Sequence, residues 1–431
     1  MKKVLVVAAA MSGVLLMGVG QAVWALSPET TMLLDLLKAK GVITQKDAAE
    51  FTKTLEESTK TSEAKTESIV PDEDEHHHSV KSLADRVERL EGKGGEGLGE
   101  LANHVKVGGL IEVDMTAGRA KDADGKKTNS SDVILKTAQL NADATVNEYV
   151  AGRIALLYEE GENSDNIALD EAFVSLKGGE TLPAYANLGR MYVPFGQYKS
   201  HFISDPMTKI LGETNDTAVV AGYANDFVDL NAGVFKGKVK ETGESEHINC
   251  TVASATLSLP KKDKDSEEGL AMSGGVSYLS NLATSDTLEP ETTTSGEANT
   301  VGGVSAFLSV AYAERFFFDA EYLGALSDFD RNDFRFADAN NRKPQTWNLE
   351  AATRFNKETE FALRYGGSHD ALKNKLQPDV VDKFILADHE YGAALLYDIF
   401  EHTALTVEYL YQKFQDDSNN SQATLQVAVE F

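Results

Sequence analysis

The chain has 431 residues and is strongly acidic, because 41 Lys and Arg stand against 68 Asp and Glu for a formal net charge of −27. Proteins that bind nucleic acid need a basic surface, so we expect no nucleic-acid partner. The single cysteine, Cys250, cannot form an intramolecular disulfide. The fold must therefore be held together by packing and hydrogen bonds alone.

Residues 1–25 have the pattern of a secretory signal peptide. A long apolar run follows Lys2 and Lys3, and we expect cleavage after Ala25. An uncleaved membrane anchor is the alternative, although the run is short for a membrane span. No later run reaches about 18 apolar residues, so the exported chain is expected to have no transmembrane helix.

The next segment, up to residue 103, has the composition of helices and linkers. Two short amphipathic helices around Gly41 predict a helical hairpin over residues 26–57, and the polar stretch 58–79 predicts a linker. Residues 80–103 predict a short coiled-coil-like helix followed by a Gly-rich joint. This helix would either form a trimeric stub or stay single, and we expect the whole segment to lie in the periplasm.

The linker also holds a weak candidate metal site. In DEDEHHH, the adjacent His76, His77 and His78 follow four acids, and histidine with carboxylate can bind transition metals. Three consecutive histidines in a polar linker rarely form a preorganised site, so a solvated linker is the simpler interpretation. We expect no bound cofactor.

From residue 104 onward, apolar residues recur at every second position. In RFFFDAEYLGAL, Phe316, Phe318 and Tyr322 alternate with Asp319 and Glu321. About sixteen such stretches occur, many of about ten residues, which is longer than the strands of a soluble sandwich. This alternation is typical of membrane strands around a wet lumen. We therefore predict an all-β transmembrane barrel of about 16 antiparallel strands over residues 104–431, preceded by a short helical periplasmic segment.

The connections support the barrel because short turns alternate with long polar loops. Asn147-Glu148 and Ala313-Glu314 are expected to be tight turns, whereas AGRAKDADGKKTNSSD (117–132) is expected to be a long loop. One connection, 259–269, is too long for the short-turn side and leaves the strand count uncertain by one pair. The final stretch, ATLQVAVEF, is predicted to be the closing strand with Phe431 at the membrane interface.

A sixteen-strand barrel encloses an aqueous channel, so residues on its inner face become candidates for selectivity. The loop over about 194–215 is long and follows Pro194, and we expect it to form a constriction. Mixed charges across the lumen would create a transverse field that orients polar solutes. The candidate constriction and pore-lining residues are Arg153, Arg190, Tyr198, Lys199, His201, Asp205, Lys209, Asp229, Glu321, Glu350, Arg354, Arg364 and Glu408.

The stretches GRMYVPFG (189–196), GGLIEVD (108–114) and LDEAFVSLKGG (169–179) resemble the LbtU-type siderophore porins of Gram-negative outer membranes. The first stretch is also similar to the Gly-Arg-x-x-x-Pro-Phe-Gly turn of phosphate-selective porins. The resemblance covers the barrel and implies a barrel without a plug that imports an iron–siderophore complex. No binding residue of that family is transferred to this sequence.

The sequence favours a diffusive outer-membrane porin, accepting siderophore–iron complexes or other small polar solutes. A non-conducting structural or adhesive barrel tethered to the cell wall is the alternative. An enzyme is not expected, because no G-x-S-x-G or comparable nucleophile motif appears. Ser368 and His369 are neighbours in a strand, so they point to opposite faces and cannot pair. The expected partners are outer-membrane lipid, lipopolysaccharide and the solute itself, and the helical prefix suggests a homotrimer.

Overall fold

The structure is a computed structural model that describes residues 104–161, 166–179, 182–259, 269–294, 296–334, 341–371 and 386–431. The expected signal peptide, helical hairpin, linker and coiled-coil-like helix lie outside the described residues, as do His76, His77 and His78. Among the described residues, no helix has the length and hydropathy needed to cross a membrane.

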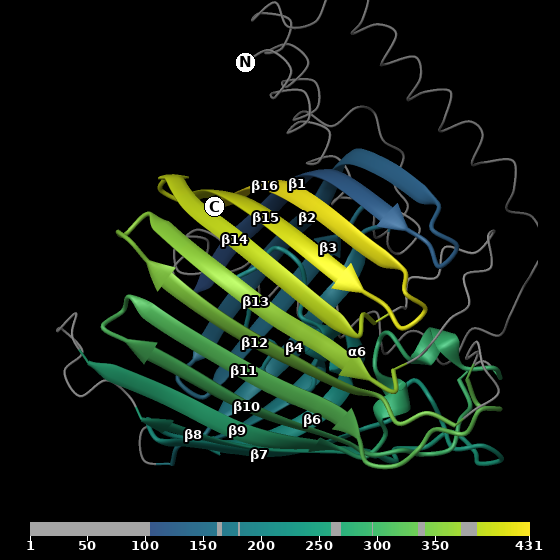
Figure 1. The fold of residues 1–431 in the computed structure, drawn as a ribbon. Helices are drawn as coiled ribbons and strands as arrows, with labels where there is room; N and C mark the ends of the chain where they lie inside the picture. Colours follow the sequence, from purple (N-terminus) through teal and green to yellow (C-terminus); the bar gives the residue numbers. More distant parts are fainter. Residues whose placement is uncertain are drawn as a thin grey trace, which may run out of the picture. The chain divides into compact units, whose positions relative to one another are not determined.

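Sixteen antiparallel strands form one closed barrel in which each strand pairs with its neighbours in the sequence and β16 pairs with β1 (Figure 1). The strands are β1 Val105–Lys121, β2 Lys127–Asn147, β3 Val150–Tyr158, β4 Ala168–Lys177, β5 Ala184–Tyr192, β6 Asn215–Ala224, β7 Val228–Phe235, β8 Cys250–Leu259, β9 Leu270–Leu279, β10 Gly303–Tyr312, β11 Phe316–Ala325, β12 Gln345–Arg354, β13 Thr359–His369, β14 His389–Phe400, β15 Thr403–Lys413 and β16 Asn419–Glu430. The predicted sixteen-strand barrel is therefore confirmed. β8 and β9 pair directly, which resolves the doubt about the strand count near 259–269.

The C-terminal alternation forms the seam that closes the barrel. Phe431 and Gly109 exchange two backbone hydrogen bonds, of 2.7 and 3.0 Å. The ring of Phe431 covers Gly109 so closely that a Cβ there would meet the ring at 2.5 Å. Glycine at this position thus allows the terminal aromatic residue to pack across the seam.

The period of two sorts side chains between the two faces of the wall. On β11, Phe316, Phe318 and Tyr322 are 50, 42 and 41% exposed, whereas Asp319 and Glu321 are 3 and 8% exposed. Because the barrel is closed, the exposed apolar residues face outward and the buried acids face the lumen. This arrangement is the reverse of a soluble protein and matches a wall between lipid and water.

The two ends of the barrel differ. At one end, tight turns join the strands, as at Ala313 and Glu314, whose φ angles of 54 and 49° match the twist of a hairpin. At the other end, connections expected to be polar pack around an apolar core that includes Val239, Leu288 and Phe329. The rings of Phe329 and Phe334 meet edge to face at 4.8 Å between centroids. These loops form a folded cap rather than free polar segments.

The prediction of a long loop over residues 117–132 was wrong. β1 continues to Lys121 and β2 begins at Lys127, so the polar residues form an extended hairpin that turns near Gly125, where φ is 86°. The reason is pairing on both sides, because β1 stays hydrogen-bonded to β2 and to β16 as far as Lys121. A continuous ladder outweighs the polar composition, which by itself suggested a loop.

Candidate pore constriction

The connection between β5 and β6, residues 193–214, folds into the barrel and packs against the inner wall. Phe195 is 1% exposed and belongs to the apolar core under the cap. The chain then turns at Gly196, where φ is 82°, and its N–H donates to Ser277 Oγ on β9 at 2.9 Å. The N–H groups of Gln197 and Tyr198 donate to the Glu321 carboxylate on β11 at 2.7 and 3.0 Å. Glu321 thus takes the place of a backbone partner for the incoming loop.

His201 meets the wall near the short-turn end of the barrel, since its partner Glu360 lies at the start of β13. Its backbone N–H donates to Glu350 at 2.6 Å. Its two ring nitrogens lie 2.7 Å from Glu360 and 3.0 Å from Asp319, so the imidazole bridges two strands. Lys199 adds an ion pair to Asp319 at 2.9 Å.

The carboxylates around His201 keep its imidazole charged. Burial disfavours the protonated ring, but the hydrogen bonds and negative charges of Asp319 and Glu360 outweigh it and raise the pKa of His201 to about 9. At neutral pH the loop therefore carries an imidazolium held between two acids. Arg354, 2.8 Å from Glu360 and 5.0 Å from the centre of the Phe317 ring, adds another cation to this cluster.

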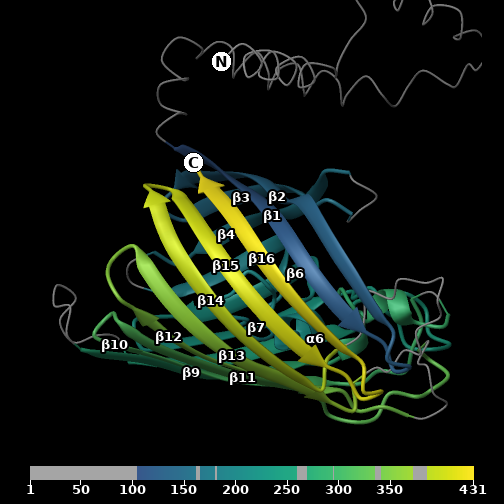
Figure 2. The same ribbon diagram turned by 45° about the horizontal axis from the view of Figure 1, so that its top comes forward.

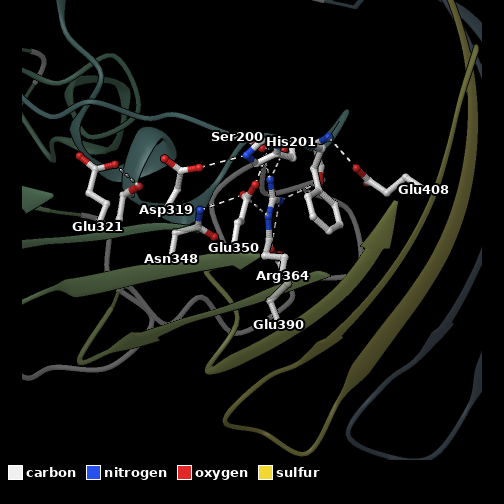
Figure 3. A network of polar contacts seen from close by, with 12 residues as sticks. Ser200, His201, Asp319, Glu321, Asn348, Glu350, Arg364, Glu390 and Glu408 are labelled. Atoms are coloured by element: carbon white, nitrogen blue, oxygen red, sulfur yellow. Dashed lines mark hydrogen bonds and ion pairs between the residues drawn. The ribbon is translucent and has the colours of Figure 1, made fainter. Parts of the chain in front are cut away.

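Arg364 on β13 fixes the loop from the wall (Figure 3). Its side chain is 0% exposed, and its guanidinium pairs with Glu350 at 2.9 Å and with Glu390 at 3.4 Å. The same group donates to Ser200 Oγ at 2.6 Å and to the Ser204 carbonyl at 2.8 Å. Two strand carboxylates and two loop residues therefore share one buried cation.

The Phe202 ring and the returning part of the loop complete the attachment. Arg364 lies 4.2 Å from the centre of the Phe202 ring, a cation–π contact in a desolvated place. The Ser204 N–H donates to Glu408 on β15 at 3.0 Å. The short helix α6, Met207–Gly212, then brings the Thr208 hydroxyl to Glu321 at 2.9 Å. Lys209 on this helix pairs with Asp205 at 2.9 Å.

The opposite wall carries charges without a loop. In a ring of sixteen strands, β3 lies across the lumen from β11. On β3, Arg153 lies 3.2 Å from Asp143 and 2.7 Å from Glu171, and its side chain is 32% exposed. On β7, Asp229 accepts a hydrogen bond from the Tyr185 hydroxyl at 3.3 Å. These groups face water in the lumen.

The structure brings seven of the sequence candidates into one network along the loop, namely Tyr198, Lys199, His201, Glu321, Glu350, Arg364 and Glu408, with Arg354 adjoining it. Arg153 and Asp229 lie on the other wall, and Asp205 and Lys209 lie at α6. The prediction that Arg190 faces the lumen was wrong. It pairs with Ala172 and Thr217 and shares the parity of Leu188, which is 39% exposed on the outward face.

Several members of the network were missed by sequence reasoning: Ser200, Ser204, Asp319, Glu360 and Glu390. The alternation already marked Asp319 and Glu360 as inward, but their pairing with one histidine depends on the path of the loop. Among the described residues, no group of three or more His, Cys, Asp or Glu could hold a metal ion. At His201, both ring nitrogens are already held by carboxylates, and Lys199 and Arg354 balance the charge.

Solved structures similar to this chain are porins of Gram-negative bacteria. The outer membrane channel DcaP of Acinetobacter baumannii matches with a TM-score of 0.51 and 14% identity over 76% of this chain and 97% of that one. The anion-selective porin of Comamonas acidovorans matches with a TM-score of 0.51 and 14% identity over 76% of this chain and 99% of that one. OprB of Pseudomonas putida matches with a TM-score of 0.52 and 12% identity over 78% of this chain and 97% of that one. The chain thus has the fold of an outer-membrane porin.

Similar sequences carry only the description UPF0422. A protein of Coxiella burnetii is 28% identical over 262 residues, which are 58% of this chain and 55% of that protein. A protein of Legionella pneumophila is 33% identical over 106 residues, which are 23% of this chain and 20% of that protein. The chain thus matches about half of the first relative and a fifth of the second. No known family profile matches it.

Proposed function

We propose that this protein is an outer-membrane porin, a water-filled channel through which small polar solutes diffuse down their gradients. The observation that carries this proposal is the inward loop over 193–214, held by charged groups on an otherwise polar inner wall. A barrel built only for structure has no need to hold a charged segment in its lumen. The porin fold of the chain supports the same conclusion.

Solutes would pass between the loop and the opposite wall. On the loop side, Lys199 keeps 42% of its side chain exposed while pairing with Asp319. Across the lumen, Arg153 is also partly exposed, beside Asp143 and Glu171. Mixed charges on two facing surfaces orient dipolar solutes and disfavour apolar ones. The net charge of −27 favours cations over anions.

Small polar solutes suit the charged lumen, and the resemblance to LbtU-type porins suggests iron–siderophore complexes among them. Assembly as a homotrimer in a lipopolysaccharide-containing outer membrane belongs to the same proposal, with the N-terminal segment in the periplasm. The transport step itself needs no catalysis and no cofactor.

The test is single-channel recording of the purified full chain in planar bilayers, with the reversal potential measured under a salt gradient. We expect stepwise conductance with a preference for cations. Lys199→Ala, which removes a cation from the loop, should increase that preference, whereas Lys357→Ala at a short turn should not. Block of the steps by a ferric siderophore would support the narrower solute class. A folded barrel that never conducts would refute the channel and favour the tethered structural barrel.

A further inference from the structure

The outward face of β14, β15, β16, β1 and β2 ends in a row of basic and amide side chains. The backbone register joins Lys127 to Lys121, Lys121 to Asn419, Asn419 to Lys413, and Lys413 to His389. Residues directly opposite in a ladder share one face, so all five point to the same side. The row lies at the end of each strand that leads into or out of a long loop. Figure 2 shows the strands from β14 to β1 side by side.

This face is outward because it continues the lipid-facing parity. Two residues closer to the middle of the barrel, the next row joins Tyr365, Tyr391, Tyr411, Ser421 and Arg119. Tyr391 is 51% exposed. On β1 and β2 the same face continues with Met115 and Val133, which are 49 and 61% exposed. A tyrosine row at the edge of an apolar band marks the membrane–water interface.

Charges of opposite sign are separated between the two faces of these five strands. All their acids have the inward parity: Glu112, Asp114, Asp132, Asp143, Glu390, Asp398, Glu408 and Glu430. Arg119, Lys121, Lys127 and Lys413 have the outward parity and are exposed. In a chain with 27 more acidic than basic residues, the charged residues on the outward face of these five strands are therefore all positive.

The lysine and arginine side chains of this surface lack close acidic partners in the described part of the chain. Among the described residues, Arg119, Lys121 and Lys127 form no ion pair, and Lys413 has only Asp417 at 3.9 Å, 89% exposed. Lys121 and Lys127 lie directly opposite each other, and like charges so placed destabilise a hairpin. An anion between them would remove that repulsion.

We propose that this surface binds the phosphate groups of a phosphorylated glycolipid of the outer leaflet, the headgroup chemistry of lipid A. The lipid chains would lie against Met115 and Val133, and the phosphates would meet Arg119, Lys121 and Lys127. Lysine and arginine near an anionic membrane surface attract it, and the tyrosine row fixes the depth of the barrel. This inference rests on the proposed outer-membrane location.

The test compares lipid A with its dephosphorylated form, each added in fluorescent form to the full chain in mixed micelles. We expect lipid A to bind at least about tenfold more tightly, with the preference falling as salt is raised. Lys121→Gln/Lys127→Gln should remove most of this preference. Arg315→Gln/Lys357→Gln, which removes two exposed cations from the short-turn end, should keep it. Inorganic phosphate should compete only weakly, because it lacks the chains.

Three results decide between the inference and the proposed function. If the wild type inserts into bilayers and conducts but binds both lipids equally, the basic row is not a phosphate site and the porin still stands. If the Lys121→Gln/Lys127→Gln variant keeps the preference in a barrel that still conducts, these residues are not the site. If the wild type does not insert into lipid at all, the proposed location fails, and the inference fails with it.

Discussion

Arg364 and Arg153 face the lumen from different walls, and each has two carboxylate partners. The Arg364 side chain is 0% exposed, and it joins Glu350 and Glu390 to the inward loop. The Arg153 side chain is 32% exposed, and it joins only residues of neighbouring strands. The wall that carries Arg364 is covered by the inward loop, whereas the wall that carries Arg153 faces the open lumen.

The difference lies in solvation rather than in the type of residue. When one member of a buried ion pair is removed, the charge of the remaining member is left uncompensated in a medium of low polarity, which costs several kcal/mol. A wet ion pair is replaced by water at little cost, typically about 0–1 kcal/mol. The loop wall should therefore determine the shape of the channel, and the open wall should determine the charge that a passing solute meets.

The largest effect is expected from Arg364→Met. This substitution leaves Glu350 and Glu390 without their cation and frees Ser200 and Ser204, so we expect about 3–5 kcal/mol lower free energy of unfolding. Release of the loop should also enlarge and destabilise the single-channel current. Urea unfolding in lipid vesicles and bilayer recording would measure both. Arg153→Met is the control, and equal losses in the two variants would contradict the comparison.

A smaller effect is expected from pH, because His201 is held charged by Asp319 and Glu360. Its folded-state pKa is raised from 6.5 to about 9, so its contribution is complete below about 6.5 and is lost as the pH rises through about 9. The loss should reach at most about 3 kcal/mol. Current noise from loop release should increase between pH 7 and 10.

The His201→Gln variant provides the control for this prediction, since glutamine keeps a hydrogen-bond donor but cannot carry the charge. Its current noise should be raised already at pH 7 and should change little up to pH 10. A wild type and a variant with the same pH profile would show that another group is responsible.

On the open wall, Arg153→Met should change selectivity with little change in stability. It leaves Asp143 and Glu171 unneutralised in water, so the reversal potential should shift further toward cations while the free energy of unfolding changes by less than about 1 kcal/mol. Reversal potentials in low salt measure the shift, and high salt should suppress it. A shift toward anions would mean that these acids do not face the solute path.

The smallest effect is expected from Asp229→Asn. Asp229 accepts two long hydrogen bonds, both of 3.3 Å, from the Tyr185 hydroxyl and from the Asn231 side-chain amide, and the carbonyl of an asparagine can still accept them. The free energy of unfolding should change by no more than about 0.5 kcal/mol, and the preference of the channel for cations should fall slightly. A large loss of stability would place Asp229 in a buried network like that of the loop wall.

The sequence by itself predicted the barrel, because a period of two together with the alternation of short and long connections admits few other folds. It also predicted which residue of each neighbouring pair faces inward, as at Asp319 and Glu360. It gave the wrong face for Arg190, where the assignment rested on the residue type instead of the parity set by Leu188. It also took 117–132 for a loop, since ladder partners on β16 lie three hundred residues away.

Only the tertiary structure decided what each inward charge does. Glu350 and Arg153 were both predicted to face inward, yet one is buried under the loop and the other lines the wet wall. The path of residues 193–214 makes this choice, because it brings His201 and Ser204 to strands that are more than a hundred residues away in the chain. A local pattern fixes the face of a side chain, but burial and partners depend on which distant segment covers it.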